Sequence, residues 1–236
     1  MSYFTYIGTE LVLFAQATNW KNYVRILLKE YIKGDVLEVG AGIGTNTHLL
    51  CHSDYRTWLC LEPDTMLLNS LKYSININGI TNCSVLNGTI DLLNKEQLFD
   101  SILYIDVLEH IDNDKEEVIK AFQHLKINGN LIILSPAHQW LFTPFDSAVG
   151  HYHRYSTSTL KAVLPDDIEI IKLGYLDCIG LLASLGNKLI LKQSQATIKQ
   201  ITIWDKFMVP LSRIFDKILG YRFGKSILLI GRKKFL

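Results

Sequence analysis

The sequence predicts an open α/β fold with a mostly parallel sheet, and three observations lead to this prediction. Short runs that are apolar on both faces alternate with stretches that have helical spacing, and the first run leads into a glycine-rich turn and a helix. No internal repeat or linker interrupts this alternation. The chain has 236 residues, of which 48% are hydrophobic, so we expect one globular domain over residues 1–236 and exclude intrinsic disorder.

Seven apolar runs are predicted to be strands, at residues 35–39, 57–61, 83–86, 101–105, 131–134, 168–173 and 226–231. Between them, apolar residues three or four positions apart predict helices at 18–33, 46–51, 65–75 and 114–125. Gly34 is a plausible stop for the first of these helices. Helices that connect successive buried strands are typical of right-handed crossovers in a parallel sheet.

Two further helices are predicted before the last strand, at about 175–191 and 198–219, with Pro210 kinking or restarting the second. This helical insertion, residues 175–224, and the N-terminal helical segment, residues 1–33, are predicted to act as lid or interface elements. The uncharged run from Ile127 to Phe145 is broken by prolines and does not suggest a membrane span.

Charge is distributed unevenly along the chain. The net charge of +1 offers no attraction of the whole molecule to nucleic acid, yet residues 187–236 hold eleven lysines and arginines against Asp205 and Asp216. The second inserted helix is predicted to have one apolar face, and Lys206, Arg213 and Lys217 lie off it. The residues of this face are Trp204, Phe207, Met208, Leu211, Phe215 and Ile218. We favour the interpretation that this face packs on the domain or on a second subunit. The alternative is that it rests on an anionic membrane surface.

The cysteines and the N-terminus favour a cytoplasmic location. Four cysteines lie far apart with no CxxC pair, and no basic segment precedes an apolar core at the N-terminus. If the basic helices touch a membrane, the protein would be peripheral at its inner face.

The motif that carries chemistry is VLEVGAGIGTNT at residues 36–47. Gly40, Gly42 and Gly44 let a backbone turn approach a ligand closely. The dinucleotide fingerprint GxGxxG would require its third glycine at Thr45, which disfavours a nicotinamide-dependent dehydrogenase.

Two acidic residues suggest the ligand of this turn. Glu62 closes the next strand, where a carboxylate can accept both hydroxyls of a ribose, and Glu38 within the first strand could face an ammonium group. A ribose at one end and a zwitterionic amino acid at the other describe S-adenosylmethionine.

From about Trp20 to Lys233 the chain resembles the class I S-adenosylmethionine-dependent methyltransferases, in particular the small bacterial methyltransferase-domain type. VLEVGAGIG matches the first motif of that family, LNGTIDLL the segment that brackets the adenine, and FDSILYIDVLEHIDND the fourth-strand motif. The turn before the fifth strand reads Lys-x-Asn-Gly where the family usually has Lys-Pro-Gly-Gly.

The resemblance implies a Rossmann-like sheet of seven strands in the order 3-2-1-4-5-7-6, with the last strand antiparallel. It implies cofactor-binding roles for Glu38, Gly40, Ala41, Gly42, Gly44, Glu62, Pro63, Gly88, Thr89, Asp106 and Val107. The product would be S-adenosylhomocysteine.

The acceptor side is predicted in the aromatic segment 138–155, which follows the fifth strand. His138 and His151 in this segment, and His110 after the fourth strand, are the candidate general bases. His151 and His153 with Asp146 would permit a metal, but we expect none because no third histidine lies at useful spacing.

The sequence therefore predicts methyl transfer to a small molecule, with oxygen favoured slightly over nitrogen, and no nucleic-acid partner. The alternative is a non-catalytic S-adenosylmethionine-binding protein that serves as a sensor or as a membrane-associated partner.

Overall fold

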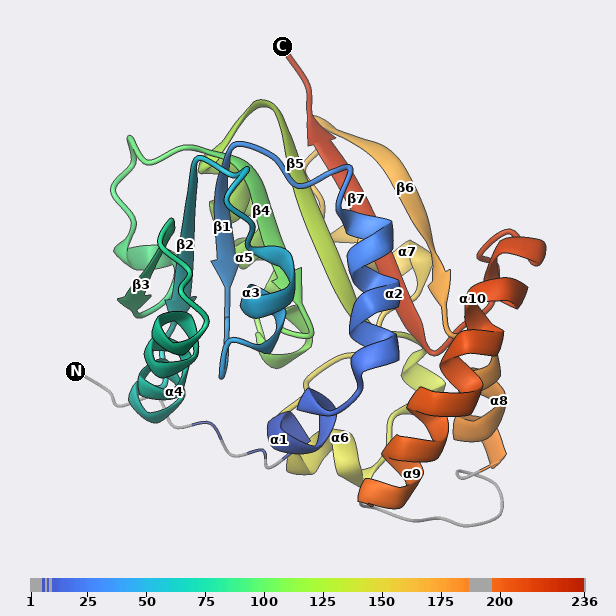
Figure 1. Ribbon diagram of the computed structural model, residues 1–236. Coiled ribbons are helices and arrows are strands. Elements are labelled where there is room, and N and C mark those ends of the chain that lie inside the picture. The colour runs from blue at the N-terminus through green and yellow to red at the C-terminus, as the bar shows by residue number, and fades with distance from the viewer. Residues whose placement is uncertain (1–5, 7, 9, 187–196, 236) are drawn as a thin grey trace.

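The computed structural model describes residues 6, 8, 10–186 and 197–235 and contains a seven-stranded sheet (Figure 1). The strand order is β3-β2-β1-β4-β5-β7-β6, as predicted. The strands are β1 Asp35–Val39, β2 Thr57–Glu62, β3 Cys83–Asn87, β4 Phe99–Ile105, β5 Leu125–Pro136, β6 Ile168–Leu176 and β7 Ser226–Lys233.

Six strands run in one direction and β7 runs against them. β7 pairs antiparallel with β5 on one side and with β6 on the other, whereas β1 pairs in parallel with β2 and β4. The carboxyl ends of the six strands therefore meet at one edge of the sheet. Because β7 is reversed, the residues just before it, Gly224 and Lys225, reach that same edge.

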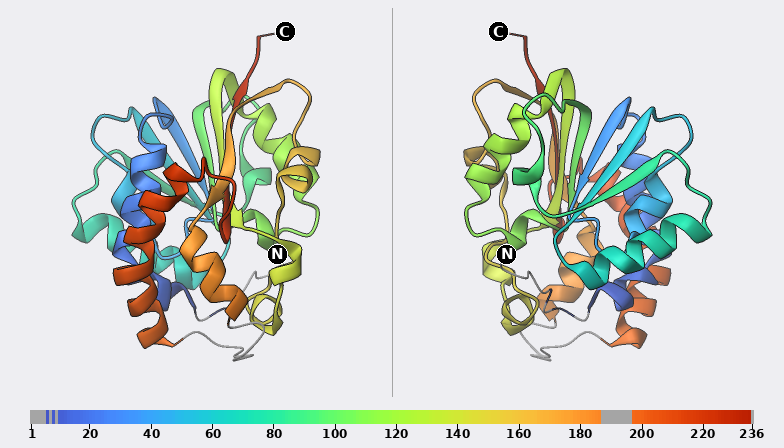
Figure 2. Two further views of the ribbon diagram at one scale, coloured as in Figure 1. Left: turned by 90° about the vertical axis from the view of Figure 1, so that its right-hand side faces the viewer. Right: turned by 90° about the vertical axis from the view of Figure 1, so that its left-hand side faces the viewer.

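The helices cover both faces of the sheet (Figure 2). Successive β1 residues enter different cores: Val36 packs on one face with Trp20 of α2, and Leu37 packs on the other with Val118 of α5. The helices preceding β6 are α1 Glu10–Ala15, α2 Thr18–Leu28, α3 Thr45–Leu50, α4 Thr65–Ile77, α5 Asp114–Gln123, α6 Pro144–Ala148 and α7 Thr157–Ala162. Short helical turns η1 Ile90–Leu92, η2 Leu108–His110 and η3 Gln139–Leu141 complete this part.

The helical insertion consists of α8 Cys178–Gly186 and a second helix in three parts, α9 Ile198–Ile203, the π-helical turn η5 Trp204–Met208 and α10 Val209–Ile218. The predicted residues 187–191 lie outside the described residues. Pro210 cannot donate a hydrogen bond to the preceding turn, and the wider turn η5 just before it absorbs the defect, so the helix continues through the proline.

The predicted single apolar face of this second helix is wrong. Trp204 and Met208 face the domain, whereas Phe207, Leu211 and Ile218 point outward and are exposed. The π-helical turn contains about one residue more than an α-helical turn, so the residues after it lie on a different side of the helix from the one that a constant 3.6-residue period predicts.

Buried aspartates fasten the insertion to the rest of the fold. Asp205 accepts hydrogen bonds from the backbone N–H groups of Asn19 (3.1 Å) and Trp20 (2.9 Å) and so caps the first turn of α2 from outside. Asp216 accepts from the Tyr23 hydroxyl at 2.9 Å and from the backbone N–H groups of Asp177 and Cys178 at 2.7 and 2.9 Å. One carboxylate thus joins α2, α8 and α10.

Replacing Asp216 with alanine should destabilise the protein, because three buried donors lose their acceptor. We expect the free energy of unfolding to fall by about 3 kcal/mol, measured by urea denaturation. The exposed Asp166→Ala variant is the control and should stay within about 0.5 kcal/mol of the wild type. An Asp216→Ala protein as stable as this control would contradict the role of the carboxylate.

Candidate functional site

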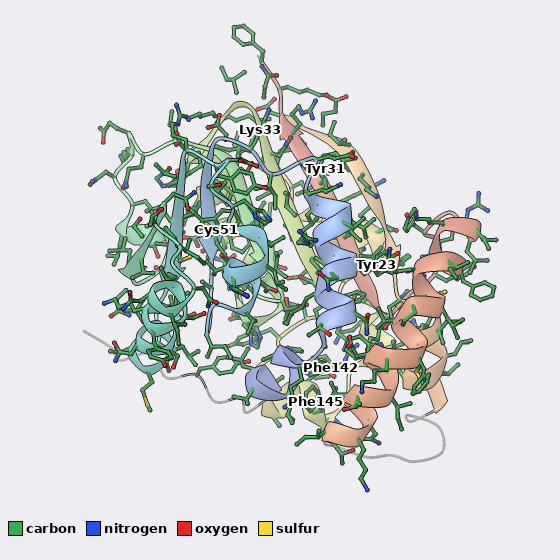
Figure 3. The ribbon with its side chains drawn as sticks, in the orientation of Figure 1. Tyr23, Tyr31, Lys33, Cys51, Phe142 and Phe145 are labelled. Carbon is green, nitrogen blue, oxygen red and sulfur yellow. The ribbon has the colours of Figure 1, made fainter. Side chains whose placement is uncertain are left out.

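A cavity of about 540 Å³ opens at the carboxyl edge of the sheet. Its walls come from the glycine-rich turn, from α2, from the ends of β4 and β5, from the segment 138–155 and from the insertion. Figure 3 labels Phe142 and Phe145 at the end of the molecule where α1 and α6 lie, and Phe145 lines the cavity. The topology thus brings residues from distant parts of the chain to one place.

The glycine-rich turn has the close backbone geometry that its sequence predicts. Gly40, Gly42 and Gly44 adopt φ values of +65°, +58° and +83°, a region that favours glycine. At Gly40 a Cβ would lie 2.8 Å from both methyl groups of Val107, so the turn and the end of β4 pack together without room for a side chain.

Glu62 holds this turn in place. Its carboxylate accepts the N–H of Gly42 at 2.7 Å and that of Asp64 at 2.9 Å. Burial raises the pKa of Glu62, while the two N–H groups act in the opposite direction. Each oxygen retains further acceptor capacity, so the arrangement leaves a ribose-binding role chemically available.

Glu38 lies in the core and not on the cavity wall. Its Oε2 atom accepts hydrogen bonds from the Thr47 hydroxyl and from Nε1 of Trp58, both at 2.8 Å, and burial raises its pKa to about 7. The side chain therefore points away from the position in which it would meet an ammonium group, and it supports β1 against β2 and α3.

Of the predicted cofactor residues, the cavity wall includes Gly40, Ala41, Gly42 and Asp106. The others lie behind or beside this wall, namely Glu38, Gly44, Glu62, Pro63, Gly88, Thr89 and Val107. The residues expected at the amino-acid end of the cofactor therefore lie together on the cavity wall. Those expected at its adenosine end lie outside this wall, at the ends of β2 and β3.

Asp106 is, with Glu109, one of the two acidic residues among the described residues that line the cavity. It follows β4 with a left-handed φ of +55°. Protein surrounds the residue on all sides, and its exposed surface faces the cavity. Burial raises its pKa, and electrostatic interactions with Lys21, His151 and Lys225 oppose that shift. Burial in turn lowers the pKa of both lysines, so the cavity holds acidic and basic groups that are poorly hydrated.

His151 is part of a buried polar network that also lines the cavity. Its Nδ1 atom lies 2.9 Å from Oδ1 of Asp146, whose side chain is completely buried. Arg154 donates from Nε (2.7 Å) and Nη2 (3.1 Å) to the same carboxylate. Although burial opposes ionisation, the hydrogen bonds from His151 and Arg154 lower the pKa of Asp146 to about 2.

The ionised carboxylate fixes the tautomer of His151. A carboxylate can only accept, so Nδ1 carries the hydrogen and Nε2 is left as the acceptor in the neutral ring. Since His151 lines the cavity, Nε2 is the ring nitrogen that a bound molecule can use.

His110 and Glu109 lie next to His151. The rings of His110 and His151 meet edge to face with centroids 4.6 Å apart, and burial, followed by the charge of His151, lowers the pKa of His110 to about 4. Glu109 is fully buried on the cavity wall, and neither of its carboxylate oxygens has a hydrogen-bond partner among the described residues. Burial and the neighbouring Asp106 raise the pKa of Glu109.

Glu109, His110 and His151 are the residues that could hold a divalent metal. One ligand atom from each lies within 4.8 Å of the others. The predicted alternative of His151, His153 and Asp146 is not assembled, because Asp146 is bound to Arg154 and Nε2 of His153 lies 3.3 Å from the carbonyl of Asp112.

His138 does not line the cavity. Its ring stacks against Trp140 and Tyr175, and Nε2 lies 3.0 Å from the carbonyl oxygen of Gly224, where it donates a hydrogen bond that ties the segment to the start of β7. This position does not support its predicted role as a base.

Comparison with known proteins now adds to this geometry. Residues 37–131 match a family model described as a methyltransferase domain. The ubiquinone biosynthesis O-methyltransferase of Rickettsia typhi is 25% identical over 114 residues, which are 47% of this chain and 44% of the relative. The chain therefore aligns with less than half of this relative's length.

Two solved structures share the fold. The YcgJ protein of Bacillus subtilis superposes with a TM-score of 0.63 at 15% identity, covering 91% of this chain and 99% of the other. A coclaurine N-methyltransferase bound to N-methylheliamine and SAH has a TM-score of 0.64 at 16% identity, covering 98% and 74%. The chain has the class I methyltransferase fold. The resemblance predicted from the sequence is confirmed.

Within the methyltransferase fold, sequence reasoning missed Lys21, Glu109 and Lys225. Lys225 could have been found from the reversed last strand, because the residue before β7 must reach the ligand edge. Glu109 stands between the predicted Asp106 and His110, and the fourth-strand motif already contained it. Lys21 sits on a helix predicted only from its apolar face, and no local signal separates it from the other lysines of that helix.

Replacing Glu62 with glutamine should weaken the binding of S-adenosylhomocysteine to the protein. Glutamine offers one neutral acceptor oxygen where glutamate offers two charged ones, so the N–H groups of Gly42 and Asp64 cannot both keep their hydrogen bonds. Loss of one hydrogen bond to a charged group predicts about a 10- to 100-fold higher Kd in isothermal titration calorimetry. The exposed Glu169→Gln variant should bind as the wild type does. An unchanged Kd for Glu62→Gln would remove this residue from the binding site.

Proposed function

We propose that the chain transfers a methyl group from S-adenosylmethionine to a hydroxyl oxygen of a small molecule, with His151 as the general base. The observation that carries the proposal is the Asp146–His151 pair. Its buried carboxylate holds Nδ1 of an imidazole that lines the same cavity as the glycine-rich turn and Asp106, and leaves Nε2 unused by that contact.

The residues on the cavity wall fit this cofactor. Asp106 suits the ammonium group of its amino-acid end, and Lys21 suits the carboxylate. Gly40 and Gly42 expose backbone beside both, and Glu62 behind the turn suits the ribose hydroxyls. When bound, S-adenosylmethionine would supply an electrophilic methyl group on a sulfonium.

The protein's own contribution is positioning and proton removal. Nε2 of His151 would accept the hydroxyl proton of the acceptor, and Asp146 would stabilise the resulting imidazolium while Arg154 keeps that carboxylate ionised. General base catalysis of this kind contributes about 10² to 10⁴ in rate. The neighbouring His110, with its pKa near 4, is a weak base at physiological pH and is less suited to this task.

The rest of the cavity suits an acceptor with an aromatic or aliphatic body. Apolar side chains form the wall around the polar groups, among them Leu11, Phe14, Trp20, Leu141, Phe145, Val149, Ile201, Trp204 and Met208. The O-methyltransferase name of the Rickettsia relative supports oxygen as the acceptor atom. The four cysteines, all free, support a cytoplasmic location.

Three other functions can be distinguished from this one by experiment. Transfer to nitrogen would need no strong base, so an amine acceptor would leave turnover insensitive to His151. A non-catalytic protein would bind S-adenosylmethionine without transferring its methyl group. A nicotinamide-dependent dehydrogenase would bind NADH in preference to S-adenosylhomocysteine, a preference that fluorescence titration detects.

Replacing His151 with glutamine should lower kcat for O-methylation by about 100-fold or more. Turnover is measured with tritium-labelled S-adenosylmethionine and a panel of phenols and catechols, with aromatic amines as the nitrogen acceptors. The Kd for S-adenosylhomocysteine should stay within about twofold of the wild type, because the base does not hold the cofactor.

The matched control is His153→Gln, two residues away and outside the cavity wall, which should keep wild-type turnover. Equal turnover of His151→Gln and wild type on a hydroxyl acceptor would contradict the proposal. Each assay is repeated in EDTA: loss of turnover there, with cofactor binding unchanged, would assign Glu109, His110 and His151 to a metal in place of proton removal.

A further inference from the structure

The outer side of the second inserted helix is an exposed apolar stripe. Large side chains recur at intervals of four, four, three and four residues along α9, η5 and α10 and remain uncovered by the described chain. The members of the stripe and their exposed fractions are Ile203 (50%), Phe207 (66%), Leu211 (47%), Ile214 (56%) and Ile218 (70%). Isolated apolar residues on a surface need no explanation, but a continuous stripe of this kind marks an interaction site.

The exposed charges of residues 197–223 are all positive. Five exposed cations belong to this segment, at Lys199, Lys206, Arg213, Lys217 and Arg222, and Lys206, Arg213 and Lys217 each precede a stripe residue by one position. Residues 197–223 contain two acids, Asp205 and Asp216, and both are buried in the contacts that fasten the helix to the domain. The exposed face of this helix is therefore apolar along its centre, with cations along one edge.

The stripe is continuous with the cavity. Ile203 belongs to both, since it is half exposed on the stripe and also lines the cavity together with Gln200 and Ile201. Figure 1 shows α10 at the right-hand margin of the molecule, with α9 reaching the end where α1 and α6 lie. A molecule leaving the surface on which the stripe rests would thus meet the cavity at Ile203.

We infer that this stripe docks the protein on an anionic phospholipid surface, from which an apolar acceptor enters the cavity. A helix with an apolar face and flanking lysines and arginines lies in the interface plane of a membrane, with its cations among anionic headgroups. Residues 198–218 would span about 30 Å along the surface. Within the described ranges no helix is long and apolar enough to cross a bilayer, so the contact is peripheral.

Charge favours a lipid surface over a second copy of the chain. Two stripes packed face to face would bring two sets of five cations together without an exposed carboxylate from residues 197–223 to pair with them. An anionic surface neutralises the same cations.

The test is sedimentation of the full chain with phosphatidylcholine vesicles, with and without 30% phosphatidylglycerol. No cofactor or acceptor is present, so the outcome is independent of the proposed methyl transfer. We expect binding to the anionic vesicles, reduced strongly by 0.5 M NaCl, and weak binding to the neutral ones.

Two variants identify the surface. Phe207→Gln with Ile214→Gln should lower the partition coefficient at least tenfold, and Lys206→Gln, Arg213→Gln and Lys217→Gln together should lower it on the order of 100-fold on anionic vesicles. The matched control, Tyr73→Gln with Ile77→Gln, removes two similarly exposed apolar side chains from α4 and should bind as the wild type does. Circular dichroism melting verifies that each variant is folded.

Three results would overturn the inference. The first is that the wild type does not bind anionic vesicles, and the second is that the stripe variants bind them as well as the wild type does. The third is that the wild type does not bind vesicles and forms a dimer in light scattering, which the double substitution Phe207→Gln with Ile214→Gln dissociates. The last result would assign the stripe to a second copy of the chain.

Discussion

The site depends on a single topological constraint, which is that six strands end at the same edge of the sheet. This edge places the glycine-rich turn after β1, Glu62 at the end of β2 and Asp106 after β4 within one region. The reversed β7 brings Lys225 to the same edge from the far end of the chain. No pair of these residues is close in sequence, and the directions of the strands make them neighbours.

A second feature is the way in which buried charge is compensated. Asp146 receives Arg154 and His151, and Asp216 receives backbone N–H groups and a tyrosine hydroxyl, so each of these buried carboxylates is hydrogen-bonded. Glu109 differs because its oxygens have no hydrogen-bond partner within the described part of the chain. An unpaired buried carboxyl on a cavity wall is costly in a free protein and is a feature of sites that bind a ligand.

Much of the fold was predictable because its signals are local. The strand β1 at 35–39 was predicted with its observed bounds, since an apolar run followed by alternating glycines has few other interpretations. The strand order came from the family resemblance and not from periodicity. The helices α6 and α7 were missed because each is only one or two turns long, although capping pairs at Thr143 and Asp146 and at Ser156 and Thr159 mark their starts.

The candidate site was predictable in part. Gly40, Gly42 and Asp106 reach the cavity, whereas Glu38 turns into the core because a strand alternates its side chains and Trp58 and Thr47 lie on that side. Which histidine could serve as a base was not decidable from sequence, since the partners of His151 and His138 are set by tertiary packing.

The most direct test of the account is a crystal structure of the protein with S-adenosylhomocysteine. We predict that its amino-acid end lies against Gly40, Gly42 and Asp106, and that its sulfur faces the space in front of Nε2 of His151. Density for the ligand at another site, or a sulfur separated by protein from His151, would contradict the account.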